Sequence, residues 1–423
     1  MSGTVGALTS GGLSLAPFRG LRPQVDEERL GRLLSPPYDV IDADLRARLL
    51  DLDADNVVAA VLPEPSPAGY ANAARTLERW VAEGLYAVDR EAGLYVYEMT
   101  DGAGHATRGL LGAVELRDAE DGVILPHENT MAGPVADRLE VMTATGADLE
   151  PIYLVYDGGG PASALVHDIG RTDPVADART PDGIRHRLWR ITDADAIDTV
   201  RADLATRRAL IADGHHRYAT YQERQRRRGA SDGAGPWDRG LALVVDSSDY
   251  GPRVHAIHRV VRGLALPDAV ARLAETAHAT ETDVERAEAL AQLPAAGFAV
   301  VLTDGNRSYV LADRTGRLDE AAHRPGEPPA LAELDVSIVH RGLVESTWRL
   351  TDDVETVGYA HDVATAVADA RASGGFAILL RATPVAAVAA VAAAGARMPR
   401  KSTLFTPKPA SGLVMRRLAD QNG

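Results

Sequence analysis

The spacing of apolar and polar residues divides the chain into alternating helices and strands. Apolar residues three or four positions apart predict helices over residues 71–82, 135–145, 194–205, 218–228 and 384–394. Short apolar runs bounded by turn residues predict strands over residues 94–99, 110–116, 152–156, 187–191, 209–212, 241–245, 254–260 and 376–380, and a hairpin over residues 298–302 and 309–311. This alternation predicts an α+β (mixed α/β) fold.

Loop-like stretches divide this pattern into five parts. We expect a disordered tail at residues 1–16, an N-terminal α/β region at 17–124, a phosphate-binding core at 125–262, a C-terminal α/β region at 263–397, and a strap at 398–423 that returns to the active site. The tail is small, glycine-rich and uncharged, and it lacks the basic start of a signal peptide.

Composition narrows the classes of protein that fit. No apolar run reaches the roughly 18 residues of a membrane span, and the absence of cysteine excludes disulfides and thiolate metal sites. A net charge of −15 argues against a large nucleic-acid surface. We therefore expect a cytoplasmic enzyme with no membrane partner, and the charge disfavours a nucleic-acid partner without excluding one. The sequence leaves open whether the protein forms a homodimer.

The first candidate site is the turn Asp213-Gly214-His215-His216-Arg217, between a predicted strand and a predicted helix. The N-terminus of a helix presents unpaired backbone N–H groups with partial positive charge. Two imidazoles and a guanidinium add to that charge, so we predict that the turn binds phosphate. A capped helix with solvated histidines is the structural alternative. Adjacent histidines seldom share one metal ion, so no metal site is expected.

The second candidate is the proline-bounded loop and helix start at residues 126–140. It contains one imidazole, one guanidinium and three carboxylates: His127, Glu128, Asp137, Arg138 and Glu140. Asp137 and Glu140 are three positions apart, so both can face one site. One carboxylate could act as general base and another could hold Mg²⁺; a solvated helix face is the alternative.

Two further segments carry candidate residues. Residues 398–409 hold the chain's two lysines, Lys401 and Lys408, together with Ser402. Lysine differs in chemistry from arginine. Its presence in this segment therefore indicates either a function that requires lysine or a chance effect of codon bias. The rigid Pro-Pro-Tyr-Asp loop at 35–40 offers Asp39, which could contact substrate or cap the following helix, and Arg19 is a further substrate candidate.

Six motifs together resemble a known prokaryotic family, the one called domain of unknown function 1015. They are, in order, Pro-Phe-Arg-Gly at 17–20, Ser-Pro-Pro-Tyr-Asp-Val at 35–40, Leu-Pro-His-Glu at 125–128, Asp-Arg-Leu at 137–139, Asp-Gly-His-His-Arg at 213–217 and Met-Pro-Arg-Lys-Ser-Thr at 398–403. Two sequence boxes of ParB-like domains have similar stretches in this chain. The first resembles the helix ending at Gly146 together with the Pro151-Ile152 pair, and the second resembles the turn from Gly214 to Arg217. That fold includes kinases of free serine.

The resemblance implies a ParB/sulfiredoxin-like nucleotide-binding core and phosphorylation of a small hydroxylated metabolite, with L-serine the leading candidate. The donor would be ATP or another nucleotide such as ADP or CTP, with Mg²⁺. Residues 213–217 would hold its phosphates, while Arg138 and Lys401 would offset developing charge. Two alternatives stay open: a phosphatase acting on a similar metabolite such as phosphoserine, and a ParB-like nucleotide-binding module with a DNA or protein partner.

Overall fold

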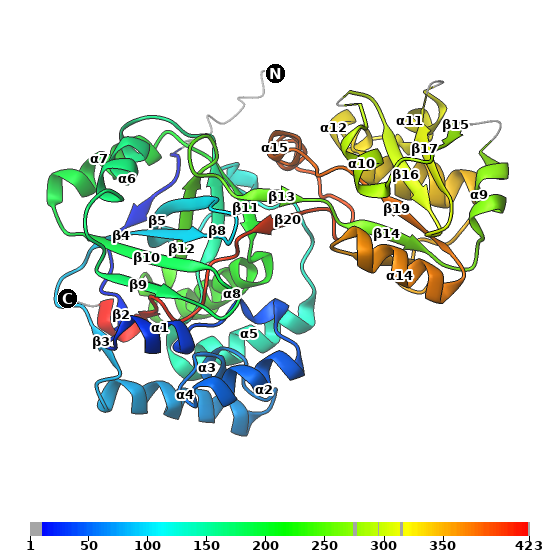
Figure 1. Cartoon of the computed structure of the whole chain (residues 1–423). Coiled ribbons are helices and arrows are strands. Elements are labelled where there is room, and N and C mark those ends of the chain that lie inside the picture. The colour runs from blue at the N-terminus through cyan, green and yellow to red at the C-terminus, as the bar shows by residue number, and fades with distance from the viewer. Residues whose placement is uncertain (1–10, 274–276, 295, 314–315, 422–423) are drawn as a thin grey trace, which may run out of the picture. The chain divides into compact units, whose positions relative to one another are not determined.

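The computed structural model describes residues 11–273, 277–294, 296–313 and 316–421. The chain forms two compact units (Figure 1). Unit 1 comprises residues up to Pro252 and from Pro407 onward, and unit 2 comprises residues 253–406. Both units combine helices with a sheet, which confirms the predicted mixed α/β class.

A nine-stranded sheet forms the centre of unit 1. Its order is β6-β11-β8-β12-β5-β4-β10-β9, and β1 pairs with the part of β5 that β4 leaves free. The strands are β1 (Leu15–Ala16), β4 (Leu94–Thr100), β5 (Ala106–Glu115), β6 (Ile124–Leu125), β8 (Ile152–Tyr156), β9 (Ala176–Arg179), β10 (Arg185–Ile191), β11 (Ala209–Asp213) and β12 (Arg239–Asp246). The β6–β11 and β8–β12 pairs are parallel and the others antiparallel, so the sheet is mixed.

Helices surround this sheet and build two apolar cores. The first core packs the sheet against α6 (Pro161–Ile169), α7 (Ala194–Leu204) and α8 (His215–Asp232). The second core lies among α1 (Glu27–Leu33), α3 (Val58–Val61), α4 (Pro67–Ala82), α5 (Ala132–Thr145) and the strand pair β2 (Leu21–Pro23) and β3 (Tyr86–Val88). The helix α2 (Ala43–Leu52) and the short helices η1 (Tyr38–Val40), η2 (Ala119–Asp121) and η3 (Pro236–Asp238) complete this part. Residues from 407 onward return to unit 1, where β21 (Arg416–Arg417) pairs with β7 (Ala147–Asp148) before η5 (Leu418–Gln421).

Unit 2 contains an antiparallel six-stranded sheet of order β15-β17-β16-β19-β14-β18. Its strands are β14 (His258–Val261), β15 (His278–Glu281), β16 (Ala299–Thr303), β17 (Ser308–Ala312), β18 (Val357–Ala360) and β19 (Phe376–Leu379). The helices are α9 (Leu266–Arg272), α10 (Arg286–Ala291), α11 (Arg317–Ala322), α12 (Pro329–Ala332), α13 (Asp335–Ser337), the π-helix η4 (Ile338–Thr347), α14 (Val363–Ser373) and α15 (Val385–Ala393). The strands β13 (Arg253–His255) and β20 (Leu404–Thr406), where the chain enters and leaves this unit, pair with each other.

Several expected boundaries differ from those of the structure. Strands from the expected regions 17–124 and 125–262 share the sheet of unit 1, because β5 pairs with β12 over seven residues. Residues 11–16 of the expected tail include the buried Leu13 and Leu15, while residues 1–10 lie outside the described residues. The predicted strand 254–260 is two strands, β13 and β14. Among the described residues, none of the helices has both the length and the apolar character that a membrane crossing requires.

Candidate functional site

The turn between β11 and α8 places the N-terminus of a helix directly after a strand of the unit 1 sheet. Gly214 precedes the helix with φ of +93°, a left-handed conformation that favours glycine. The helix begins at His215, three residues before the predicted start, and its N-cap residue is Gly214, which has no side chain to cap it. Backbone N–H groups in the first turn of a helix have no acceptor within that helix. A helix therefore begins at this turn, as the sequence predicts, and a helix N-terminus carries partial positive charge.

Arg217 holds this turn from inside the protein. Only 1% of its surface is exposed; it forms an ion pair with Asp213, and its Nη1 donates to the carbonyl oxygen of Pro151 at 2.6 Å. Burial alone would lower the pKa of Arg217, but the carboxylates of Asp213, Glu150 and Asp39 outweigh burial and raise it. The guanidinium is thus a fixed cation that joins the start of α8 to the residue before β8.

Lys408 extends this ion pair into a row of four charges, Arg217–Asp213–Lys408–Asp39. Its Nζ lies 2.5 Å from Asp213 Oδ1 and 3.1 Å from Asp39 Oδ2. Burial opposes the charge on Lys408, yet the two carboxylates raise its pKa. Burial would raise the pKa of Asp39, but Lys408 and Arg217 lower it. Since 39% of the Asp39 side chain is exposed, this carboxylate is the open end of the row.

A second set of residues, none of them a candidate from the sequence except Arg138, supports this row. Glu150 is buried, and its Oε1 accepts from the backbone N–H of Tyr38 at 2.9 Å and from Ser411 Oγ at 3.0 Å. The Arg138 guanidinium carbon lies 4.3 Å from the centre of the Tyr38 ring. Burial raises the pKa of Tyr38 to about 12, so its hydroxyl is neutral at pH 7. These contacts fix the loop that carries Asp39.

The loop at residues 127–131 lies against the N-terminus of α8. The backbone N–H of His127 donates to His215 Nε2 at 3.2 Å, and that of Met131 donates to His216 Nε2 at 3.1 Å. The rings of His127 and His215 are both buried and meet edge to face, with centroids 4.6 Å apart. Because His215 accepts at Nε2, the proton of its neutral ring lies on Nδ1.

Glu128 is the carboxylate that this loop brings to the helix N-terminus. Its Oε2 lies 3.8 Å from His215 Nδ1 and its Oε1 lies 4.0 Å from His127 Nε2. The side chain keeps 35% of its surface exposed. Glu128 therefore lies between two buried imidazoles and solvent, next to the first turn of α8.

The other predicted acids on α5 have different surroundings. Asp137 accepts from Arg138 at 3.0 and 2.5 Å and from the Tyr70 hydroxyl at 2.8 Å. Arg138 is buried and also donates to the carbonyl oxygen of Val61. Glu140 is exposed. Asp137 is thus held in an ion pair, and the two carboxylates do not share one environment although they are three residues apart.

The structure does not join the remaining candidates to this cluster. The Nε of Arg19 donates to the carbonyl oxygen of Asp89 at 3.0 Å, and its backbone N–H donates to Gln421 Oε1 at 3.1 Å. Lys401 and Ser402 belong to unit 2, whereas Lys408 belongs to unit 1. Lys401 is exposed with φ of +53°, and the buried Ser402 donates from Oγ to the carbonyl oxygen of Pro399 at 2.5 Å.

Within the described parts of the chain, no group of three or more His, Asp or Glu side chains is arranged to hold a metal ion.

Fold and site together define a mixed α/β protein with a charged cluster around one helix N-terminus. The model of the family described as "Protein of unknown function (DUF1015)" matches residues 15–337, and the chain belongs to this family. No curated protein matches the chain.

The solved structures to which the chain is similar share little sequence with it and have low TM-scores. One is a free serine kinase in complex with AMP, 17% identical, covering 70% of this chain and 90% of its own, with a TM-score of 0.34. Another is a conserved hypothetical protein from Pyrococcus furiosus, 18% identical, covering 70% and 93%, with a TM-score of 0.33. A third is SbnI with a C-terminal truncation from Staphylococcus aureus, 12% identical, covering 74% and 90%, with a TM-score of 0.36.

Proposed function

We propose that unit 1 is a nucleotide-dependent kinase that phosphorylates the hydroxyl group of a free amino acid, with L-serine as the leading acceptor. The observation that carries this proposal is the position of Glu128. Its carboxylate lies 3.8 Å from His215, the first residue of α8, beside the N-terminus of that helix. Phosphoryl transfer needs a site for anionic phosphates and a base for the acceptor hydroxyl, and this arrangement offers both.

The phosphates would bind at the start of α8. The backbone N–H groups of residues 215–217 supply donors and the helix supplies partial positive charge. Lys408 adds a cation whose ion pairs with Asp213 and Asp39 hold it beside the turn. The donor would be ATP, or ADP or CTP, and Mg²⁺ would neutralise phosphate charge, with the exposed Asp39 carboxylate available as one ligand.

In the transfer step, Glu128 would accept the proton of the acceptor hydroxyl. The hydroxyl oxygen would form a bond to the terminal phosphorus of the nucleotide, and the bond from that phosphorus to the bridging oxygen would break. The shortened nucleotide would leave with the electron pair of the broken bond. His127 and His215 would orient Glu128, while Arg217 would position the turn. Asp137 and Glu140 are weaker candidates for the base, because one is held by Arg138 and the other is exposed.

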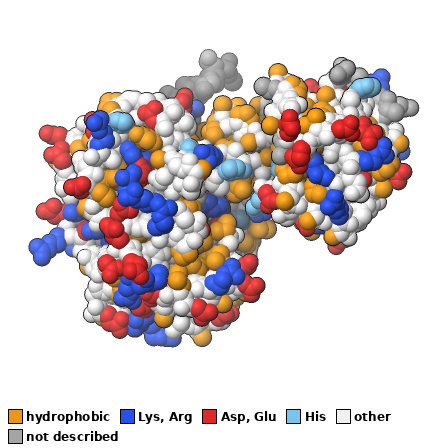
Figure 2. Space-filling view, viewed as in Figure 1, with side chains coloured by type: hydrophobic (Ala, Val, Ile, Leu, Met, Phe, Trp, Pro, Cys, Tyr) orange, Lys and Arg blue, Asp and Glu red, His pale blue; other side chains and the backbone are white. Residues whose placement is uncertain are grey.

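A phosphatase is the second candidate, because the same anion site and carboxylate could direct water at a phosphorylated metabolite such as phosphoserine. A nucleotide-binding module with a DNA partner fits less well. The net charge is −15, and Figure 2 shows basic side chains interspersed with acidic ones on the face in view. A nucleic-acid surface needs a concentrated basic face.

Phosphorus NMR of the full chain separates these candidates. The protein would be incubated with Mg²⁺, L-serine and ATP, ADP or CTP in turn, and separately with phosphoserine alone. A kinase produces phosphoserine with one of the nucleotides. Release of phosphate from phosphoserine, without synthesis from any nucleotide, would establish the phosphatase instead, and salt-sensitive DNA binding without turnover would establish the module.

A substitution tests the role of Glu128. Glu128→Gln keeps the size of the side chain and removes the base, so kcat should fall by about 10²- to 10⁴-fold. Glu83→Gln is the control, since it removes an exposed carboxylate at the end of α4 and should leave kcat unchanged. Equal rates for wild type and Glu128→Gln would show that Glu128 is not the base and that another group accepts the proton.

A further inference from the structure

Unit 2 contains a cavity of about 610 Å³ that the proposed function does not use. Its size lies within the range of small-molecule sites, roughly 300–1,000 Å³. The apolar part of the wall consists of Phe298, Leu334 and Ile338, which are buried, and Ala387 on α15. The wall thus comes from residues next to β16, α13 and α15, all within unit 2.

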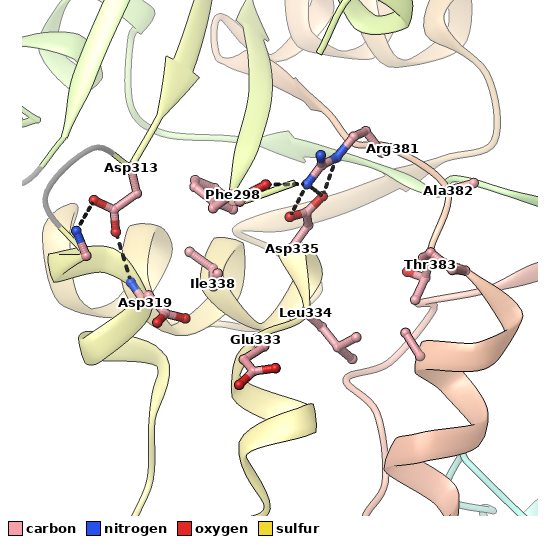
Figure 3. A pocket seen from close by; sticks show the side chains of 14 residues that line it. Phe298, Asp313, Asp319, Glu333, Leu334, Asp335, Ile338, Arg381, Ala382 and Thr383 are labelled. Atoms are coloured by element: carbon pink, nitrogen blue, oxygen red, sulfur yellow. Dashed lines mark hydrogen bonds and ion pairs between the residues drawn. The ribbon is translucent and has the colours of Figure 1, made fainter. Parts of the chain in front are cut away.

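Three of the charged groups in this wall already have hydrogen-bond partners within the protein. Figure 3 shows Arg381 facing Asp335, and two hydrogen bonds of 2.8 Å join the guanidinium to the carboxylate. Arg381 also donates to the carbonyl oxygens of Gly297 and Pro294. Asp313 accepts from the backbone N–H groups of residues 316, 318 and 319 at 2.8–3.1 Å. These groups shape the cavity and are not available to a ligand.

Two other carboxylates in the wall are available. Asp319 on α11 is half-buried and Glu333 after α12 is exposed, and neither side chain forms an ion pair with any described residue. Both are drawn at the cavity in Figure 3. Among the described residues that line the cavity, the wall therefore carries four carboxylates and one guanidinium, that of Arg381. Its field favours a cation and disfavours an anion.

We propose that this cavity binds a small organic cation, an amine or amidine attached to an apolar body. The apolar body would pack against Phe298, Leu334 and Ile338. The cationic head would lie between the carboxylates of Asp319 and Glu333. This site is separate from the proposed kinase site in its residues, and its ligand has the opposite charge to a nucleotide.

Calorimetric titration of the full chain with three probes tests the proposal. Benzamidine and phenethylamine carry a cation on an aromatic body, and benzoate carries an anion on a similar body. Both cations should bind with a dissociation constant on the order of 1 mM, as fragment-sized ligands do, and benzoate should not bind. Equal binding of benzoate, or no binding of either cation, would overturn the proposal.

Variants locate the binding. Asp319→Asn and Glu333→Gln should each weaken benzamidine binding about fivefold, the effect of one partly exposed ion pair. Ala387→Phe fills the cavity and should abolish binding of both cations. Glu320→Gln is the matched control, because Glu320 follows Asp319 on α11, is exposed and does not line the cavity. Unchanged affinity in the first three variants, or an equal loss in the control, would refute this location.

Discussion

Replacing Lys408 by methionine tests the row of charges that fixes the Asp39 loop to the start of α8. Removing one partner of a fully buried ion pair costs about 3–5 kcal/mol, because the other partner stays buried without its counter-ion. Here Asp213 keeps Arg217 as partner, and Asp39 is 39% exposed and can be hydrated. We therefore expect Lys408→Met to lower the free energy of unfolding by about 2 kcal/mol, below the range for full burial.

Urea denaturation followed by tryptophan fluorescence measures this loss, since three of the four tryptophans lie in unit 1. The pH dependence gives a second readout. The pKa of Asp39 is lowered in the folded protein, so its contribution is present above the ordinary value of 3.8 and is lost as pH falls through the folded pKa. The pKa of Lys408 is raised, so its contribution is present below 10.5 and is lost as pH rises through the folded pKa. In Lys408→Met, the loss of stability at low pH and the loss of stability at high pH should both be smaller than in the wild type.

Arg201→Met is the matched control. Arg201 pairs with Asp198 on α7, and more than half of each side chain is exposed, so the cost should stay within about 0.5 kcal/mol. The row of charges would not stabilise unit 1 if Lys408→Met lost no more stability than Arg201→Met and lost stability at low pH as the wild type does.

Three further substitutions test other parts of unit 1, each by urea denaturation. Gly214→Ala should cost about 1–3 kcal/mol, because φ of +93° strains any side chain and the new Cβ would lie 3.2 Å from the Arg217 guanidinium; wild-type stability would mean that the turn changes conformation. Burial lowers the pKa of His186 to about 4, so the protein should lose stability as pH falls from about 6.5 toward 4, and His186→Gln should reduce this loss; an identical pH profile would contradict a buried neutral imidazole. Asp148→Asn should cost about 3–5 kcal/mol, since this fully buried carboxylate accepts from two buried arginines; a smaller loss than in Lys408→Met would contradict that ranking.

The sequence predicts the local elements of this protein better than its long-range contacts. The periodicity of apolar residues yields α7, β8, α15 and the hairpin of β16 and β17 to within about two residues. The Asp213–Arg217 turn is likewise a local feature, formed by one glycine and a helix start. Its ion pair between Asp213 and Arg217 joins two residues only four positions apart, across the turn from β11 to α8.

The contacts of Glu150 could not be predicted in the same way. Glu150 accepts from Tyr38, 112 residues earlier, and from Ser411, 261 residues later. Nothing in the local pattern around any of these three residues indicates the others, because their common position depends on how the whole of unit 1 folds. The segment at residues 398–409 shows the same limit. Its two lysines are seven residues apart, yet the boundary between the two units falls between them.

The division of unit 1 into two stretches of chain also sets the order in which the protein can mature. During synthesis, Asp213 and the start of α8 are made before any of unit 2, whereas Lys408 is made 195 residues after Asp213. Until then Asp213 has Arg217 but lacks its second cation, and Glu150 lacks Ser411. The antiparallel pairing of β13 with β20 brings the entry and exit of unit 2 together, which shortens the loop that must close before Lys408 can reach Asp213. A nascent chain therefore gains the complete charge row only after unit 2 has been synthesised, so a truncated product that lacks the returning segment carries an incomplete site.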